Sequence, residues 1–301
     1  MLDATLLLPD FLLIALGWLL CRHTPLSRSV WDGAERLVYY LLFPALLFSS
    51  ILRNPMGLAS ALPLALCGLA VVGAGIGMAY ALRLLPGVDA RLHASGAQTA
   101  FRFNSYVALA LAERLAGGPG VAWTALLMSV CVPLCNVAAV WPLARHGGQG
   151  YLRELARNPL IIATASGLAC NLLGITLPDL LGITLGRIGA AALPLGLMAV
   201  GAGLQLGALR EGPGLAAALL GIRHLALPAL ALWLVQLMGL PPAQQAVVLA
   251  FAALPTASSA YVLAVRMGGH GAFTAGLVTM STLLAMVTLP LWLAALGALA
   301  R

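Results

Sequence analysis

The chain is a succession of long apolar runs, and no polar segment between them is long enough to form a soluble domain. Only 8% of its residues are charged, against about 25% in a soluble domain, and 61% are apolar. A helix of about 20 apolar residues spans the hydrocarbon core of a bilayer. The sequence therefore predicts an all-α integral membrane protein, embedded in the lipid bilayer of the cell (inner) membrane.

The charged residues and cysteines favour neither a nucleic-acid partner nor an enzyme. All sixteen cations are Arg, scattered without a basic stripe, so the net charge of +7 is better explained by membrane orientation. Cys131 and Cys135 stand on one helix face without His or carboxylate neighbours at metal-ligand spacing. The chain has no HExxH and no nucleotide-binding glycine motif. We therefore expect no metal, no cofactor and no catalytic site.

Ten transmembrane spans can be drawn along the chain. They cover residues 4–21, 37–52, 59–82, 93–113, 121–143, 159–176, 187–208, 214–238, 243–266 and 271–299. The loops on one side of these spans carry ten Arg, and the other side, which includes both termini, carries four. Because cytoplasmic loops are enriched in Arg and Lys, both termini are predicted on the outer (periplasmic) side of a multi-pass protein.

The two halves of the chain resemble each other weakly. Pro9 and Pro159 open two spans 150 residues apart, and Pro44 and Pro194 interrupt two others at the same offset. Five spans per half is an odd number, so the second half must enter the membrane from the opposite side. We predict a 5+5 inverted repeat, typical of secondary transporters. Residues 1–143 form the first five-helix repeat, 144–158 a cytoplasmic linker and 159–301 the second repeat.

Spans four and nine carry polar residues where a membrane helix should be apolar. Arg102 and Asn104 lie within span four, and a cation in the hydrocarbon costs roughly 2.5–3.5 kcal/mol unless it faces a protein interior or a water-filled cavity. In span nine, Pro255 removes a backbone donor in mid-helix. Hydroxyl side chains just after it can satisfy the freed groups. We predict that both spans are broken helices that meet at a central site.

A broken helix presents free amides, with partial positive charge, at the start of its second half. We expect Asn104 or Ser105 to cap that end in span four, and Ser258 or Ser259 to cap it in span nine. Arg102 adds a full charge, so the site should favour an anion. The candidate substrate-binding residues are Arg102, Asn104, Ser105, Tyr106, Pro255, Thr256, Ser258, Ser259 and Tyr261.

Structural roles stay open for most of these residues. Asn104 and the hydroxyls could merely satisfy backbone groups at a kink, the tyrosines could pack, and Pro255 binds nothing itself. Arg102 could pair with a carbonyl end or reach toward a cytoplasmic loop. In span eight, Arg223 could snorkel to the cytoplasmic face or mark the true start of the span. No pair of carboxylates is expected deep in the membrane, so ion coupling is not supported.

Two segments resemble the crossover helices of the auxin efflux carrier family of membrane transporters: FRFNSYVALALAERLAG from Phe101 and LPTASSAYVLAVRMGG from Leu254. The resemblance implies five plus five helices, with helices four and nine crossing, and transport of small organic anions such as auxin in plants or malonate in bacteria. By that match, Asn104 and the backbone around Pro255 contribute to the substrate site. The chain departs from the family pattern after Asn104, where Ser105 and bulky Tyr106 replace a small Thr-Gly-like pair.

The prediction is therefore a secondary transporter of a small organic anion, a carboxylate such as malonate or an auxin-like acid, working by alternating access. A sodium- or proton-coupled exchanger of related inverted-repeat fold is the alternative. A membrane enzyme or receptor would not need paired helix breaks. The expected partners are the anion and the bilayer, with no nucleic acid, and a homodimer is an open alternative to a single chain.

Overall fold

The computed structural model describes residues 8–53, 58–140, 159–204 and 212–299, and all regular elements in these ranges are helices. Six helical segments of the described chain are long and apolar enough to cross a membrane. They are Arg28–Arg53, Ala61–Leu84, Ser105–Ala139, Asp179–Ala202, Pro213–Leu237 and Gly271–Leu299. The chain is therefore an all-α, multi-pass membrane protein. The predicted linker 144–158 and both chain termini lie outside the described residues.

The helices before residue 141 are α1 (Leu8–His23), α2 (Arg28–Leu37), the π-helical turn η2 (Val38–Leu42), α3 (Phe43–Arg53), α4 (Leu58–Ala81), η3 (Leu82–Leu84), α5 (Ala90–Gly96), α6 (Gln98–Phe101) and α7 (Ser105–Val140). α7 consists of two helices joined at a kink, where Ala116 leaves helical geometry and Gly117 adopts a φ of 59°. A positive φ is readily available only to glycine. This kink separates predicted spans four and five.

The helices after residue 158 are α9 (Pro159–Leu172), α10 (Asp179–Ala190), α11 (Ala192–Ala202), α12 (Pro213–Gly221), the π-helical turn η5 (Ile222–Ala226), α13 (Leu227–Leu237), α14 (Pro242–Ala252), α15 (Ser259–Arg266) and α16 (Gly271–Leu299). Each of the ten predicted spans overlaps at least one of the described helices.

Two predicted span starts are wrong. Span two was predicted from residue 37, but its helix begins at Arg28, because the polar residues of α2 are satisfied within the helix: Arg28 lies 3.0 Å from Asp32 and 2.9 Å from Glu35. Span seven was predicted from residue 187, but its helix begins at Asp179. An acid in its first turn and Arg187 in the last turn of α10 both suit the helix dipole.

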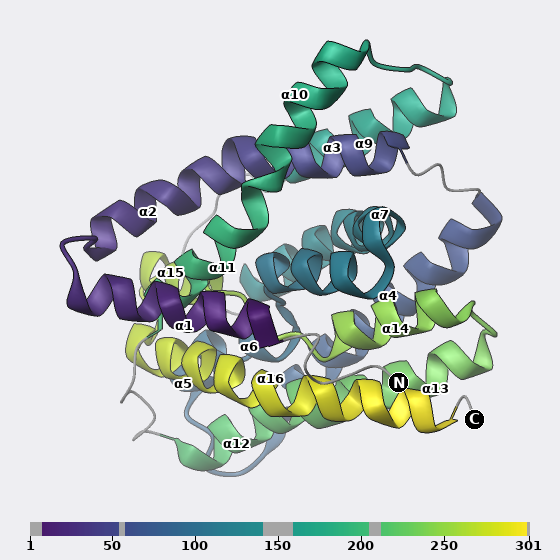
Figure 1. The fold of residues 1–301 in the computed structure, drawn as a ribbon. Coiled ribbons are helices and arrows are strands. Elements are labelled where there is room, and N and C mark those ends of the chain that lie inside the picture. Colours follow the sequence, from purple (N-terminus) through teal and green to yellow (C-terminus); the bar gives the residue numbers. More distant parts are fainter. Residues whose placement is uncertain (1–7, 54–57, 141–158, 205–211, 300–301) are drawn as a thin grey trace.

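The helices pack as two groups. The first group comprises α1, α2 with η2 and α3, α9, α10 and α11; the second comprises α4 to α7 and α12 to α16. In Figure 1, α3, α9 and α10 lie at the top of the view and α12, α13 and α16 at the bottom, with α7 and α14 between them. Among the described residues, the extensive contacts between the groups are made by α7, with α3, α9 and α11.

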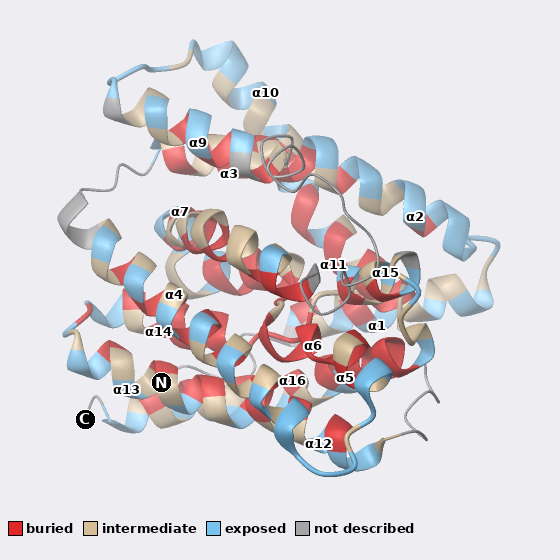
Figure 2. Cartoon of the chain, turned by 180° about the vertical axis from the view of Figure 1, so that it is seen from behind, coloured by how far each residue is buried: buried red, intermediate tan, exposed pale blue. Residues whose placement is uncertain are grey.

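Backbone-to-backbone contact holds the first group together. A Cβ added to Gly201 of α11 would lie 1.7 Å from the carbonyl oxygen of Ile14, and one added to Gly17 of α1 would lie 1.9 Å from that of Met198. Small residues allow this close approach, which favours helix association in lipid. The second group instead buries its interior segments almost completely, as the red colour around α6 and α14 shows in Figure 2.

Candidate functional site

The two predicted breaks exist and lie against each other. α6 ends at Phe101 and α7 begins at Ser105, while α14 ends at Ala252 and α15 begins at Ser259. Between these ends, Phe103 and Thr256 form an isolated antiparallel β-bridge. The backbone N–H of Asn104 donates to the carbonyl oxygen of Pro255 at 2.9 Å. The non-helical segments therefore satisfy part of each other's backbone in the interior of the protein.

Thr256 has a structural role at this junction. Its hydroxyl donates to the carbonyl oxygen of Thr99, and at 3.5 Å to that of Arg102, at the carbonyl end of α6. Its backbone N–H donates to the hydroxyl of Ser281 at 2.9 Å. Thr256 is fully buried and, like Pro255, does not line the cavity described below. Of the two predicted alternatives for Thr256, the structure favours backbone satisfaction.

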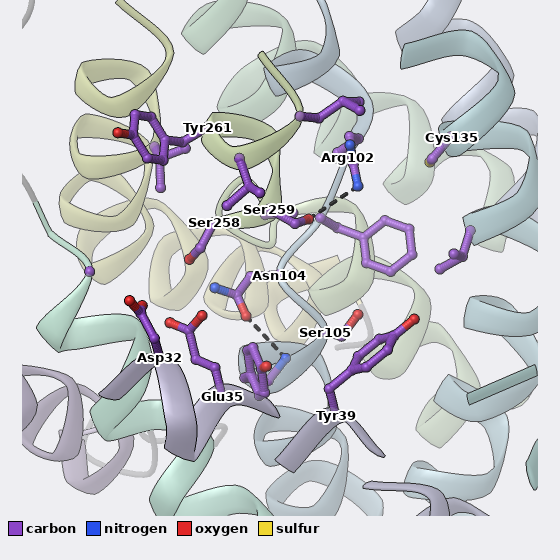
Figure 3. A pocket seen from close by; sticks show the side chains of 18 of the residues that line it. Asp32, Glu35, Tyr39, Arg102, Asn104, Ser105, Cys135, Ser258, Ser259 and Tyr261 are labelled. Carbon is purple, nitrogen blue, oxygen red and sulfur yellow. Dashed lines mark hydrogen bonds between the residues drawn. The ribbon is translucent and has the colours of Figure 1, made fainter. Parts of the chain in front are cut away.

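Asn104 caps the amide end of α7, as predicted. Its Oδ1 accepts hydrogen bonds from the backbone N–H groups of Tyr106 at 3.0 Å and Val107 at 3.3 Å. The side chain is 2% exposed, and its Nδ2 has no hydrogen-bond partner among the described residues. Figure 3 shows this nitrogen directed into the cavity, toward the side occupied by Ser258. A buried amide donor without a partner is costly and points to a ligand that accepts from it.

A cavity of about 790 Å³ opens at the junction, between the two helix groups. This volume is within the range of small-molecule sites. Its lining draws on α2, α3, α7, α9, α11, α15 and α16 and on both breaks. Of the nine predicted residues, those that line it are Arg102, Asn104, Ser105, Tyr106, Ser258, Ser259 and Tyr261.

Arg102 lies at the cavity wall and bridges the two breaks. Its Nη1 donates to Oε1 of Gln98 and its Nη2 to the hydroxyl of Ser259, each at 3.1 Å. Ser259 is therefore bonded to Arg102 instead of capping α15, and Ser258, at the N-cap position, makes no side-chain cap bond either. The prediction of a serine cap on span nine is wrong. Among the described residues, no side chain caps the amide end of α15, so its partial positive charge is not offset by any of them.

The two tyrosines differ in their surroundings. Tyr106 packs between the helix groups: its ring lies 4.9 Å from that of Phe43, and a Cβ added to Gly196 would lie 2.4 Å from its Cδ1. This contact with α11 is possible because residue 196 is glycine. Tyr261, on α15, lines the other side of the cavity.

The sequence reasoning missed a charged cluster that also lines the cavity: Arg28, Asp32 and Glu35 on α2. The side chains of Asp32 and Glu35 are 51% and 28% exposed, and Figure 3 shows Glu35 beside Asn104, with Asp32 next to Glu35. Charges at positions i, i+4 and i+7 before an apolar run were the available signal, because this spacing places them on one helix face. The expectation that no carboxylate pair lies deep in the membrane stays a prediction, since Asp32 and Glu35 are partly exposed residues of the cavity wall.

Arg223 does not reach the protein surface, and it does not lie at the start of its helical segment. It lies in η5, within the apolar segment Pro213–Leu237, and is 2% exposed. Its Nε donates to the carbonyl oxygen of Leu254 at 2.6 Å. Its neighbour His224 contacts the hydroxyl of Ser281 at 2.8 Å, and Ser281 accepts from Thr256. Arg223 thus bonds the backbone of the second break directly, and His224 supports it through Ser281.

Comparison with known proteins gives two matches. A protein family described as "Membrane transport protein" matches residues 143–293, half of the chain, including the second break. A relative from Rhizobium meliloti (strain 1021), named "Putative malonate transporter", is 25% identical over 312 residues, which cover 94% of this chain and 92% of the relative. The second match therefore includes both breaks and the cavity between them.

Proposed function

The chain belongs to the auxin efflux carrier family of membrane transport proteins, and from this premise we propose that it carries a small organic anion across the membrane by alternating access. The observation that carries the proposal is the Nδ2 of Asn104, a buried donor that has no partner among the residues the structure describes and that is directed into a cavity at the junction of two broken helices. A carboxylate oxygen is the acceptor that this donor lacks.

Electrostatics support an anion at this point. The amide ends of α7 and α15 both begin at the junction, and helix N-termini favour negative charge. Arg102 adds a full positive charge to the same wall. On the α2 wall, Arg28 bonds both carboxylates and offsets one of their two negative charges. The relative named for malonate transport supports a carboxylate, and malonate is the first substrate to test.

We propose that the ten helical segments form a 5+5 inverted repeat and that the two helix groups move relative to each other during transport. Support comes from the two breaks, which bridge in antiparallel fashion near equivalent positions of the two halves. Further support is that α7 carries the extensive contacts between groups while the cavity lies between them. We also propose that both termini lie on the periplasmic side and that the protein works as a single chain or as a homodimer.

The test combines binding and transport with purified protein. Malonate, succinate, acetate and indole-3-acetate are compared with malonamide, the uncharged analogue of malonate, in thermal unfolding. A ligand of the folded state raises Tm in a saturable way. Proteoliposomes then measure uptake of each stabilising anion. We expect at least one carboxylate to raise Tm and to be taken up, with no effect of malonamide. If every anion left Tm unchanged and none entered the liposomes, the proposal would be abandoned.

A proton-coupled carrier is the second candidate, because Asp32 and Glu35 line the same cavity. A carboxylate that exchanges its proton as the cavity changes access could couple anion movement to a pH gradient. Uptake by wild type and by Glu35→Gln, with and without an imposed pH gradient, separates the two candidates. Gradient-driven uptake that disappears in Glu35→Gln supports coupling, while equal uptake under all four conditions supports an uncoupled carrier.

A further inference from the structure

Arg223 is a buried cation whose hydrogen-bond partners are backbone carbonyls. Its Nε lies 2.6 Å from the oxygen of Leu254 and its Nη2 lies 3.4 Å from that of Phe251. None of the ion pairs among the described residues includes it. Removing a charge from water is expensive unless polar groups compensate for the loss, so these carbonyl oxygens must supply most of the compensation.

The two carbonyls lie at and just beyond the negative end of a helix: Phe251 is in the last turn of α14, and Leu254 is in the break that follows it. α14 stops at Ala252, and the last carbonyl groups of a helix have no intrahelical partner. They carry the negative half of the helix dipole, equivalent to about half an elementary charge. In a buried break, water cannot reach them freely. The end of α14 therefore requires a cation or several hydrogen-bond donors.

Carriers with discontinuous helices often meet this requirement with a transported ion, since unwound carbonyls and half-helix C-termini coordinate sodium. Here the guanidinium group of Arg223 occupies that position. The π-helical turn η5 supplies it, and such turns often occur at functional sites. The adjacent His224 bonds Ser281, which accepts from the backbone of Thr256, so consecutive residues of η5 support the break on both sides of Pro255.

We propose that Arg223 is a built-in substitute for a coupling alkali cation at the carbonyl end of α14. The carrier therefore needs no sodium or potassium ion there, and removal of the Arg223 charge turns the same carbonyl oxygens into a site for a small monovalent cation. Arg223 is a positioning residue: it holds the carbonyl of Leu254, and the carbonyl of the next residue, Pro255, accepts from the backbone N–H of Asn104. The statement about coupling rests on the proposed transport function; the statement about the cation site does not.

The test uses three variants of the full chain. Arg223→Gln removes the charge but keeps donors, Arg223→Lys keeps a charge, and Arg53→Gln is the matched control, because Arg53 also donates to a backbone carbonyl, that of Gly182, but is exposed. Thermal unfolding is measured in choline, sodium, lithium and potassium chloride at equal ionic strength, and with guanidinium far below denaturing concentrations.

We expect wild type, Arg223→Lys and Arg53→Gln to show one Tm in all salts. Arg223→Gln should unfold several degrees lower in choline and recover in a saturable way with one of the small cations or guanidinium. A purely structural arginine would give the same loss of Tm without this recovery. The proposal is contradicted if no cation raises the Tm of Arg223→Gln, or if sodium raises the Tm of wild type in a saturable way.

If Arg223→Gln cannot be purified in any salt, Arg223→Lys decides. If Arg223→Lys folds and its Tm is the same in all salts, the site requires a positive charge, as proposed. If Arg223→Lys aggregates, the site requires the guanidinium geometry, and the proposal fails. Uptake by wild type should be equal with inward sodium, potassium or choline. Because the unfolding measurements require no substrate, a failure of transport and a failure of the cation substitution are distinguishable.

Discussion

Substitution of Asn104 separates its two roles, since Oδ1 caps α7 while Nδ2 faces the cavity. Asn104→Asp keeps a capping oxygen, and aspartate is as good an N-cap as asparagine. It replaces the free donor by a second, negatively charged oxygen. We therefore expect a folded protein of nearly unchanged stability whose affinity for an anion is sharply reduced.

The magnitude follows from the single missing bond. A hydrogen bond to a charged group contributes about 1.5–3 kcal/mol, and each 1.4 kcal/mol corresponds to about tenfold in Kd. Loss of the Nδ2 donor should weaken binding roughly 10- to 150-fold. The aspartate charge adds repulsion. Asn104→Ser, which is uncharged and can still cap, should show the loss of the donor alone, and Asn104→Ala should also lose about 0.5–2 kcal/mol of stability with the cap.

Titration of Tm with the stabilising anion and concentration-dependent uptake in proteoliposomes measure both effects. Asn171 provides the matched control: its amide donates to the carbonyl oxygens of Ile51 and Leu52, away from the cavity. Asn171→Ala should lower Tm and leave anion affinity unchanged. Wild-type affinity in both Asn104→Asp and Asn104→Ser would show that the free donor does not face the substrate, and the proposed site would be wrong.

Two further predictions concern the helix groups. Gly201→Ala should destabilise the protein by about 1–3 kcal/mol or more, because the new Cβ would lie 1.7 Å from the Ile14 carbonyl oxygen. Gly73→Ala is the control and should not destabilise it, because its Cβ would enter open space. Thermal unfolding compares the two variants, and equal Tm values would refute the packing argument. Arg114→Ala should break the 2.6 Å ion pair with Asp10 that links α7 to α1. Breaking a buried pair costs about 3–5 kcal/mol of stability. We expect a loss at the lower end of this range, because Arg114 is 32% exposed. The exchange Asp10→Arg with Arg114→Asp should recover part of that loss, and no recovery would show that the pair is not what joins the helices.

The two breaks could be predicted because their residues conflict with their surroundings. A proline and an Arg–Phe–Asn run within apolar segments have few interpretations in a membrane, since each freed backbone group must find a partner there. The cap by Asn104 followed from residue type alone. Contact between the breaks was inferred from general transporter architecture, and the structure confirms it through the bond from Asn104 to Pro255.

Two features could not be predicted from local sequence patterns. Hydropathy assigned the start of α2 to a loop because Arg28, Asp32 and Glu35 look solvent-exposed in sequence, although they satisfy one another on a helix facing the cavity. The role of Arg223 depends on carbonyl groups some 30 positions later in the chain. No side-chain pattern marks a backbone acceptor, so only the three-dimensional arrangement identifies that contact.

The four half-helix ends at the junction are not satisfied equally, and this asymmetry bears on how an anion would lie. The carbonyl end of α6 is bonded by the Thr256 hydroxyl, and that of α14 by Arg223, whose Nη2 donates to the carbonyl oxygen of Phe251. The amide end of α7 is capped by Asn104, but that of α15 has no side-chain cap within the part of the chain that the structure describes. Because positive potential remains strongest where no acceptor offsets it, a carboxylate should lie nearer α15, between Arg102 and the free amide of Asn104. The α2 wall, with its own carboxylates, then faces the uncharged or second end of the substrate, so substitutions at Asp32 and Glu35 should change which anions are selected more than whether one is bound.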